Sequence, residues 1–585
     1  YENLKNSLLT FQFISSDYNV PGSTSGRFPT QTQVLEKVLP AFAYLVLSSS
    51  QPDIDLTTAF KSLWKPNEEP VKSFISRVMS DITFKNTIGE VEKMVELAEK
   101  TTEVNPTIPL GVKILPYAGL FMSRNEKWTL SMKGYSKYIW DYEASSSENQ
   151  YGRYLSYGQV QFSKLNSSVN SFQPANSQWD WSHIPGTTTK YLTKAELDFN
   201  NTSKHRNFSD DPFLGGTVMD NKTAVFSNSI HDNTFDVNFY VKKSVFQFDS
   251  LYYFIGSGIQ NTDNAHAVHT TLFQNQKISS ADNILLNGNV ITSSQTDIQQ
   301  PVIVDNYNNA FFLKEGNTTI DFDTNFITAY INHGNTVSNG SYSYLMVPDI
   351  SQNDLSYLLN NKDNILQVLK QDNKTHAVYY EPENTLGLVV FDASDLINLQ
   401  RVIEVNIPMT LILKEQSDTL HLAFTDPDMH RPSAINIDNL TNTAVIAESQ
   451  PSTVIIKLMG EYEQCESSAP EISSRIENGK TNIEYGNAKD GKTYFISLKK
   501  KNPNGIETTD EPTFSINKTD KDRYSINPGS SDCYHIALYC SLGKILMNDK
   551  NLQGEQIVSL ENYPSGVFIL NMTSNNRKKN VKIIK

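Results

Sequence analysis

The order of the sequence patterns predicts a multidomain α+β protein, with helices first and a long antiparallel β-region after them. Residues 33–100 carry apolar side chains at helical spacing, whereas from about residue 110 short alternating runs are separated by Asn, Gly, Ser and Asp. The chain has 585 residues, too many for one hydrophobic core, so several domains are expected. Hydrophobic residues make up 38% of the chain and charged residues 19%, which is the composition of a folded globular protein.

The amino-terminal hundred residues are predicted to be helical. In residues 33–48 apolar residues recur at helical spacing, and Pro40 is expected to kink or restart that helix. The same pattern predicts three further helices at residues 53–64, 70–82 and 90–100. The segment 105–111 contains two prolines and a glycine and is punctuated like a domain linker.

The rest of the chain is predicted to be strands, apart from one helix at residues 355–369. Residues 224–226 and 237–241 are examples of the expected strands, and Asn287-Gly288-Asn289 is a turn signal. Five domains are expected: helices at 1–104, a large central β-sandwich at 105–375, a smaller β-domain at 376–463, a linker or accessory β segment at 464–524, and a terminal β-domain at 525–585.

Charge and composition limit the partners. The formal net charge is −14, which argues against nucleic acid as the main partner. No apolar run is long enough to span a membrane, and we expect no signal peptide within these 585 residues. The three cysteines have no metal-binding spacing, and Asp426-Pro427-Asp428 is the single weak candidate for a calcium contact. Because the start resembles the middle of a protein, we expect a truncation or processing point there.

An ordered set of motifs resembles the central β-domain of polysaccharide lyase family 8, the family of chondroitin, hyaluronate and xanthan lyases. The motifs are Tyr142-Glu143, Glu148-Asn149, residues 151–158 and the WDW..PGTT segment at 179–189. Residues 207–216, 243–248, 270–274 and 344–348 resemble later parts of the chondroitin ABC branch. The resemblance covers roughly residues 1–460. It implies the end of an α/α toroid in 1–104 and a mutarotase-like antiparallel β-sandwich after it.

The resemblance also implies catalytic residues. Arg27 matches the family's glycine-arginine loop and would orient the catalytic groups and contact the sugar, while Gln31 stands where a second arginine often lies. Glu143, with Glu148 as the other candidate, would pair with the arginine. Gln31, Asn149 and Arg153 are the expected substrate-binding residues. The alternative is a surface arginine on a turn and solvated strand-end glutamates.

The implied activity is β-elimination at a uronate of chondroitin or dermatan sulfate, with hyaluronan as a further candidate. In this family the histidine and tyrosine that handle the proton precede the arginine, and no such pair precedes Arg27 here. We therefore expect a fragment that is inactive alone. Two other classes are a non-catalytic carbohydrate-binding β-protein and a glycoside hydrolase with two placed carboxylates. The hydrolase is disfavoured, because Glu143 and Glu148 would face opposite sides of a strand.

The remaining candidates are weaker. His183, His266 and His269 are expected to be surface or packed residues, and the WDW segment is expected to pack a sandwich core. The tail, which ends in the basic strand 582–585, resembles sorting domains of the type nine secretion route. This implies a secreted, periplasmic or cell-surface protein of a Bacteroidetes-like bacterium. We expect a monomer without an organic cofactor, in which Ca²⁺ or Mg²⁺ could assist with sulfated sugars.

Overall fold

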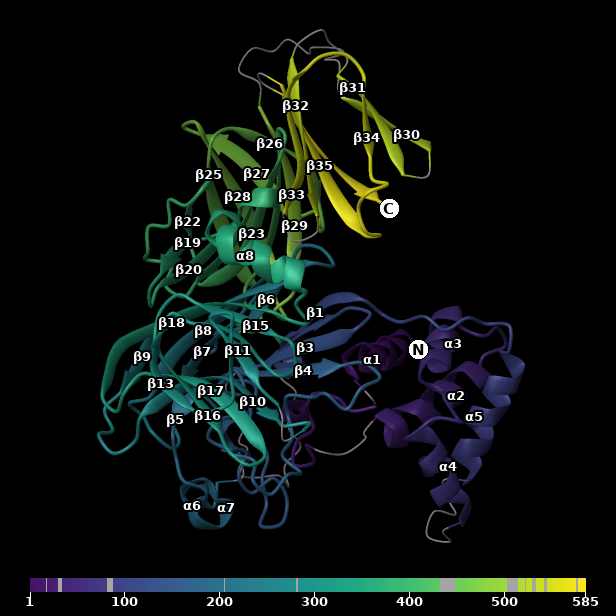
Figure 1. Cartoon of the computed structure of the whole chain (residues 1–585), viewed down its shortest axis with the longest axis vertical. Coiled ribbons are helices and arrows are strands. Elements are labelled where there is room, and N and C mark those ends of the chain that lie inside the picture. Colours follow the sequence, from purple (N-terminus) through teal and green to yellow (C-terminus); the bar gives the residue numbers. More distant parts are fainter. Residues whose placement is uncertain are drawn as a thin grey trace. The chain divides into compact units, whose positions relative to one another are not determined.

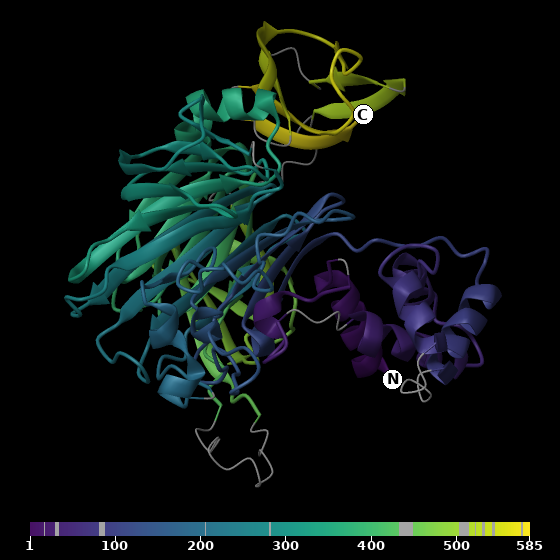
Figure 2. The same ribbon diagram turned by 60° about the horizontal axis from the view of Figure 1, so that its bottom comes forward.

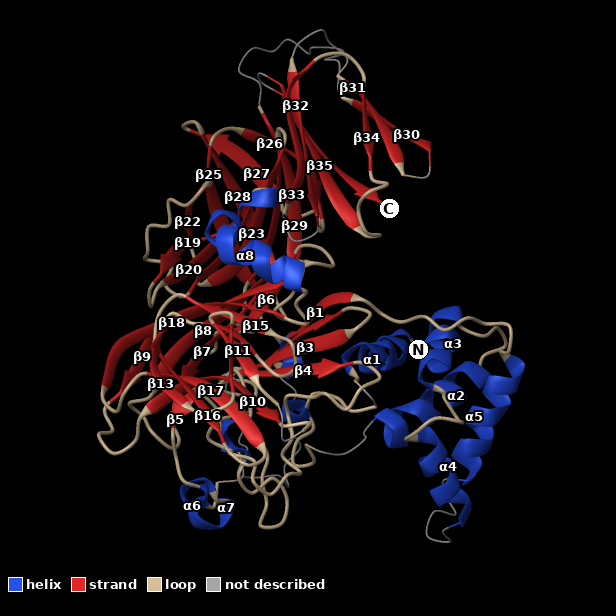
Figure 3. Ribbon diagram, in the orientation of Figure 1, coloured by secondary structure: helices blue, strands red, loops and turns tan. Residues whose placement is uncertain are grey.

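The computed structural model describes most of the chain, namely residues 1–16, 18–29, 34–80, 88–204, 206–279, 282–431, 448–501, 514–520, 522–528, 533–540, 544–574 and 577–585. The chain divides into two compact units. The first comprises residues 1–215, 228–243 and 256–344, and the second comprises residues 216–227, 244–255 and 345–585. Figure 3 shows that most of the helices are gathered in the amino-terminal part and that strands dominate the rest, where α8 (Gln352–Ile365) is the longest helix.

Five helices form one group at the start of the first unit, as both views show (Figure 1 and Figure 2). They are α1 (Glu2–Ile14), α2 (Leu39–Leu47), α3 (Ile54–Leu63), α4 (Val71–Ser80) and α5 (Ile88–Lys100). Apolar stripes on these helices form one core, in which α2 packs against α3 and α5. Pro40 lies in the first turn of α2, directly after a π-helical turn at Val34–Val38, so the predicted restart of the helix is confirmed.

Two predictions about helices need correction. The helix expected at 355–369 is α8 (Gln352–Ile365), and residues 366–369 belong instead to strand β19 (Leu366–Gln371), which pairs with its neighbour in a sheet. Two single-turn helices, α6 (Lys194–Leu197) and α7 (Phe199–Thr202), were not predicted. Four residues are too few to display helical periodicity, so hydrophobic pattern alone could not reveal them.

The first unit contains a four-stranded and a five-stranded antiparallel sheet. The four-stranded sheet has the order β1 (Gly111–Leu115), β2 (Leu120–Arg124), β3 (Trp128–Lys133), β4 (Gln159–Lys164). The five-stranded sheet has the order β13 (Gln295–Gln299), β16 (Asn317–Phe322), β17 (Phe326–Asn332), β10 (Val268–Gln276), β5 (Thr188–Lys190). Leu120 and Met122 of β2 join the helical core, so this sheet is fixed to the helices.

A nine-stranded sheet has the order β12 (Asn289–Ile291), β11 (Ile284–Leu286), β14 (Val302–Val304), β15 (Ala310–Leu313), β18 (Val337–Val347), β9 (Leu251–Asn261), β8 (Tyr240–Phe248), β7 (Thr223–His231), β6 (Leu214–Val218). The predicted turn at residues 287–289 joins β11 to β12, with positive φ at Asn287 and Gly288. The strand expected at 237–241 begins only at Tyr240, because residues 233–235 and 237–238 form turns.

The second unit contains a β-sandwich. Its seven-stranded sheet has the order β19, β20 (Thr375–Tyr380), β21 (Thr385–Val390), β23 (Met409–Gln416), β24 (Thr419–Thr425), β29 (Tyr494–Lys500), β26 (Tyr462–Ser467). The facing sheet has the order β22 (Val402–Val405), β25 (Ser452–Met459), β28 (Lys480–Ala488), β27 (Ser473–Glu477). Apolar residues of both sheets form one core. This pairing crosses the domain limit expected at 463/464; the domain limits themselves stay predictions.

Two small antiparallel sheets complete the chain and share one core. The first has the order β30 (Ser515–Asp520), β31 (Arg523–Asn527), β34 (Gln556–Ser559), and the second has the order β33 (Ile545–Leu552), β32 (Tyr534–Cys540), β35 (Val567–Ser574), β36 (Arg577–Ile584). The predicted multidomain fold, a few helices followed by several antiparallel sheets, is confirmed. Among the described residues, no helix combines the length and the apolar character needed to cross a bilayer.

Candidate functional site

Arg27 lies on a loop that is fastened to the four-stranded sheet. The backbone N–H of Gly22 donates to Gln161 Oε1 of β4 at 3.0 Å, and Gly22 packs so closely on the Phe172 ring that a Cβ would overlap it. Gly26 has a φ of +60°, in the left-handed region that glycine adopts without strain. The loop therefore has a fixed base, and its tip presents Arg27, whose side chain is 43% exposed.

The acidic residues lie on an irregular loop between β3 and β4. Tyr142 and Ala144 are buried and pack with Phe199, whereas the side chain of the intervening Glu143 is 21% exposed. Asn149 closes the loop, because its side-chain amide donates to the Glu143 carbonyl at 2.8 Å. Asn149 has a φ of +52°, a conformation that asparagine tolerates better than most residues. The Asn149 side chain, which was expected to bind substrate, therefore makes its observed contact inside the loop.

Arg27, Glu143 and Glu148 meet in space although the arginine is more than a hundred residues from the glutamates. Arg27 Nε lies 3.5 Å from Glu148 Oε2 and 3.9 Å from Glu143 Oε1. Both glutamates therefore reach the same guanidinium. The expectation that they would face opposite sides is wrong, because residues 143–149 form a closed loop and not a strand. Arg27 is held by ion pairs at the edge of hydrogen-bonding range and stays accessible.

Sequence reasoning missed Arg206. Its Nη2 donates to Glu143 Oε1 at 2.9 Å, and its guanidinium lies 4.9 Å from the centre of the Trp140 ring. The side chain is only 15% exposed. The segment that carries Arg206 is 63 residues from Glu143, so no local pattern pointed to it. Its position directly before the family-like stretch 207–216 was the one available signal.

Of the other expected substrate-binding residues, the structure describes Arg153. Arg153 is 7% exposed and forms an ion pair with Asp232 at 3.1 Å, with its guanidinium 3.7 Å from the centre of the Phe235 ring. A guanidinium buried and paired in this way favours a structural role, and we leave Arg153 out of the proposed site. Gln31 lies outside the residues that the structure describes.

The histidines are hydrogen-bonded, as expected for packed residues. His183 lies between Asp180, at 2.8 Å, and His269, at 3.0 Å, and both imidazoles stack on Tyr330. Burial lowers the pKa of His269 to about 3, so this ring is neutral. Trp179 is buried between Phe172 and Phe326, which confirms that this part of the WDW segment packs the core.

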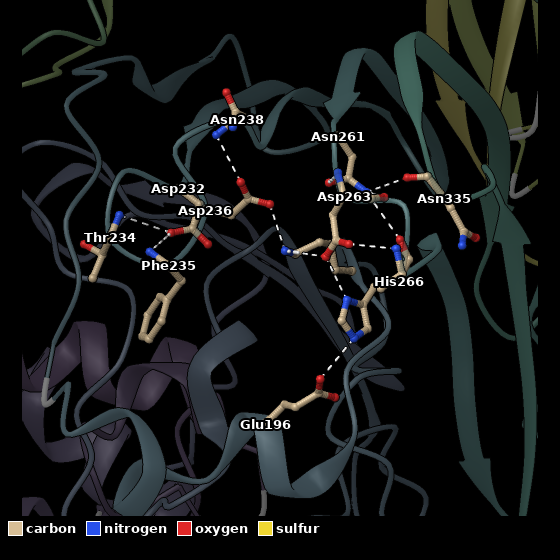
Figure 4. A network of polar contacts seen from close by, with 12 residues as sticks. Glu196, Asp232, Thr234, Phe235, Asp236, Asn238, Asn261, Asp263, His266 and Asn335 are labelled. Atoms are coloured by element: carbon tan, nitrogen blue, oxygen red, sulfur yellow. Dashed lines mark hydrogen bonds and ion pairs between the residues drawn. The ribbon is translucent and has the colours of Figure 1, made fainter.

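A second polar network surrounds His266 in the first unit. Figure 4 shows His266 between Asp263 and Glu196, with Nδ1 2.7 Å from Asp263 Oδ2 and Nε2 3.0 Å from Glu196 Oε1. Lys190 joins the network through Asp263 and Asp236. The hydrogen bond to Asp263 raises the pKa of His266 above 6.5, and the same contact lowers the pKa of Asp263.

The His, Cys, Asp and Glu side chains of the described residues are the candidate metal ligands. Across the part of the chain that the structure describes, no three or more His, Cys, Asp or Glu side chains are grouped so that they could hold a metal ion. Asp426 of the Asp426-Pro427-Asp428 turn instead lies 3.0 Å from His430 Nε2 and also accepts a hydrogen bond from Ser452.

Comparison with known proteins shows which domains this chain is similar to. Residues 116–321 match the super-sandwich domain of polysaccharide lyase family 8, and residues 367–434 match the C-terminal β-sandwich domain of the same family. Residues 116–321 and 367–434 are therefore similar to two β-domains of polysaccharide lyase family 8. This confirms the predicted resemblance for those residues.

Individual relatives are distant but consistent. The chondroitin sulfate ABC exolyase of Proteus vulgaris is 24% identical over 74% of this chain and 43% of its own length. The chondroitin sulfate ABC endolyase of Proteus vulgaris is 22% identical over 83% of this chain and 46% of its own length. A chondroitin sulfate ABC exolyase of Bacteroides thetaiotaomicron is 22% identical over 86% of this chain and 52% of its own length. The chain thus spans about half the length of these relatives.

Solved structures agree on the fold. The Paenibacillus xanthan lyase superimposes with a TM-score of 0.65 at 16% identity, covering 98% of this chain and 58% of that chain. The Streptomyces coelicolor A3 chondroitin AC lyase superimposes with a TM-score of 0.60 at 13% identity, covering 85% of this chain and 65% of that chain. At these identities the likeness shows the fold alone.

Proposed function

We propose that this chain takes part in β-elimination at the uronate of a glycosaminoglycan, with chondroitin or dermatan sulfate as the first candidates and hyaluronan as a further one. The observation that carries the proposal is the meeting of Arg27 with Glu143 and Glu148. The two family-8 β-domains and the chondroitin lyases among the relatives support it.

In the proposed chemistry, Arg27 binds the substrate and Glu143 orients Arg27. In the elimination a base removes the C5 proton, the C4–O bond breaks, a double bond forms between C4 and C5, and the leaving oxygen takes a proton. An exposed guanidinium offers several N–H donors to a uronate carboxylate or a sugar hydroxyl. The glutamates fix its orientation, so that less ordering is needed when the substrate binds.

We further propose that the proton-transfer histidine and tyrosine are supplied from outside these 585 residues. The support is that the sequence contains no histidine before His183, whereas the family places this pair ahead of the arginine. The purified chain should therefore bind chondroitin sulfate while producing only traces of unsaturated uronate, measured by its ultraviolet absorbance. Robust turnover by the chain alone would contradict this assignment of the base.

Two rival functions are separated by their products. A non-catalytic carbohydrate-binding protein is favoured by the same absence of an upstream histidine, and it would give no product under any condition. A glycoside hydrolase is favoured by the two carboxylates beside Arg27. Hydrolysis would release reducing ends without the absorbance of a double bond, so reducing-end and ultraviolet assays discriminate all three once the chain is joined to a helical segment that supplies the histidine and tyrosine.

The tail and the cellular location are further proposals. We assign residues 525–585 to a sorting domain of the type nine secretion route, on the basis of its strand-rich sequence and basic final strand. This agrees with a secreted, periplasmic or cell-surface protein that acts as a monomer. A reporter fused to residues 525–585 should reach the surface or medium of a bacterium that has this route, and intracellular retention would contradict the assignment.

A further inference from the structure

The Glu143 carboxylate has its closest cationic contact with a residue other than Arg27. Among the described residues, Arg206 Nη2 lies 2.9 Å from Glu143 Oε1, whereas Arg27 Nε lies 3.9 Å from the same oxygen. The first distance is that of a charge-assisted hydrogen bond, and the second is an ion pair without one. Glu143 is therefore held mainly from the side of Arg206.

Arg206 is itself held in place. The next residue, Asn207, exchanges two hydrogen bonds with Asp141: the Asn207 N–H donates to Asp141 Oδ1 at 2.9 Å, and the Asp141 N–H donates to the Asn207 carbonyl at 3.0 Å. These bonds join the segment that carries Arg206 to the start of the acidic loop. Trp140 then covers the guanidinium at 4.9 Å. The arginine is thus positioned on two sides before it meets Glu143.

The two arginines differ in exposure. The Arg206 side chain is 15% exposed, whereas the Arg27 side chain is 43% exposed. A mostly buried guanidinium that is already hydrogen-bonded to a carboxylate is poorly placed to receive a polymeric substrate. The exposed one has donors available to a ligand.

We propose that Arg206 is a positioning residue that holds the Glu143 carboxylate and so keeps Arg27 available for the uronate. This deepens the proposed function and rests on it for the identity of the ligand. Without Arg206, the Glu143 carboxylate would be free to turn fully onto Arg27 and to compete with the substrate carboxylate for the same donors. A substitution of Arg206 should therefore affect Arg27 only while the Glu143 carboxylate is present.

The first experiment needs no polysaccharide. The 585-residue chain is treated with an arginine-selective dicarbonyl reagent, and modification of Arg27 is followed by peptide mass spectrometry. We expect Arg206→Ala to slow the modification of Arg27 at least threefold, because the released carboxylate covers it. In a Glu143→Gln background the same substitution should change the Arg27 rate by less than 1.5-fold. The proposal would be overturned if Arg206→Ala left the rate of Arg27 modification unchanged in the wild-type background, or slowed it equally in the wild-type and Glu143→Gln backgrounds.

Two further variants make this result specific. Lys204→Ala removes a positive charge from an exposed residue two positions away and should leave the Arg27 rate unchanged. Arg206→Lys keeps the charge but loses the planar fork, and its Arg27 rate should lie between those of the wild type and Arg206→Ala. Circular dichroism checks folding. If Arg206→Ala does not fold, the comparison of Arg206→Lys in the two backgrounds decides the question by the same criterion.

The second experiment measures binding of chondroitin sulfate oligosaccharides by calorimetry. Arg206→Ala should weaken binding about fivefold in the wild-type background and less than twofold with Glu143→Gln, while Lys204→Ala should change it less than twofold. If the wild-type chain binds no acidic oligosaccharide, the proposed function fails, and the modification of Arg27 still decides the role of Arg206. Equal weakening by Arg206→Ala in both backgrounds would show that Arg206 does not act through Glu143.

Discussion

Gly26 sets the approach of the Arg27 loop to Glu143. Its φ is +60°, and a Cβ added there would lie 3.1 Å from Glu143 Oε2. Gly26→Ala should therefore both strain the loop and push the carboxylate aside, at a cost of about 1–2 kcal/mol in the free energy of unfolding. Urea unfolding measures this cost. Gly89→Ala is the matched control, because a Cβ there meets no atom within 4 Å and helix α5 favours alanine.

Individual site residues could be predicted from the sequence where a complete motif contained them. Arg27, Glu143 and Glu148 could be selected because glycine-arginine and tyrosine-glutamate lie in the expected order. The side on which the two glutamates lie could not be predicted, because that depends on whether residues 143–149 form a strand. The serine run at 145–147 was a signal for a loop. Arg206 depends on a contact across 63 residues, which no local pattern contains.

Helix α6 shows how an element too short to be stable alone is held in place. A single turn does not recover the cost of helix nucleation. Here Thr193 and Glu196 form a capping box, and the second carboxylate oxygen of Glu196 lies 3.0 Å from His266. Both ring nitrogens of His266 face carboxylates, which only accept hydrogen bonds, so the imidazolium form fits the site.

The pH dependence of this contact follows from the two pKa shifts. The pKa of His266 is raised above 6.5, so its stabilisation is complete below pH 6.5 and is lost as the pH rises through the folded value. The pKa of Asp263 is lowered from 3.8, so its contribution is complete above pH 3.8 and is lost as the pH falls through the folded value. Both contributions are complete between pH 3.8 and 6.5.

Hydrogen exchange tests this prediction at α6. Protection of residues 194–197, corrected for intrinsic exchange, should be greater at pH 5.5 than at pH 9 in the wild type. His266→Gln should lose that difference, whereas His231→Gln, which alters a histidine contacting Asp210 instead, should keep it. A pH difference at α6 that survives His266→Gln would contradict the assignment.

Element types were predicted better than element ends. Pro40 marked the start of α2, and the Asn287–Asn289 turn marked a hairpin, because each depends on backbone preferences of a few neighbouring residues. The end of α8 was misplaced because the mostly apolar residues 366–369, Leu-Gln-Val-Leu, suit either a helix or a strand. Pairing with β20 decides between them, and that pairing is tertiary.

At the scale of the whole molecule, we propose that the helical segment and the domain similar to the family 8 super-sandwich jointly build a lyase site around Arg27 and Glu143. The order of helices followed by sheets was predictable from hydrophobic periodicity. The pairing of β26 with β29 and of β25 with β28 was not, because strands far apart in sequence are joined by contacts that periodicity does not record. Function therefore has to be tested on the assembled site.

The most direct measurement is ultraviolet detection of unsaturated uronate from chondroitin sulfate, using a protein in which this chain is joined to a helical segment that supplies the histidine and tyrosine. The joined protein should turn over substrate, and Arg27→Ala or Glu143→Ala should each lower the rate by about a hundredfold or more with folding retained. Arg523→Ala removes an exposed arginine paired with Glu561 and should leave the rate unchanged. Full turnover by the Arg27→Ala and Glu143→Ala proteins would contradict the account.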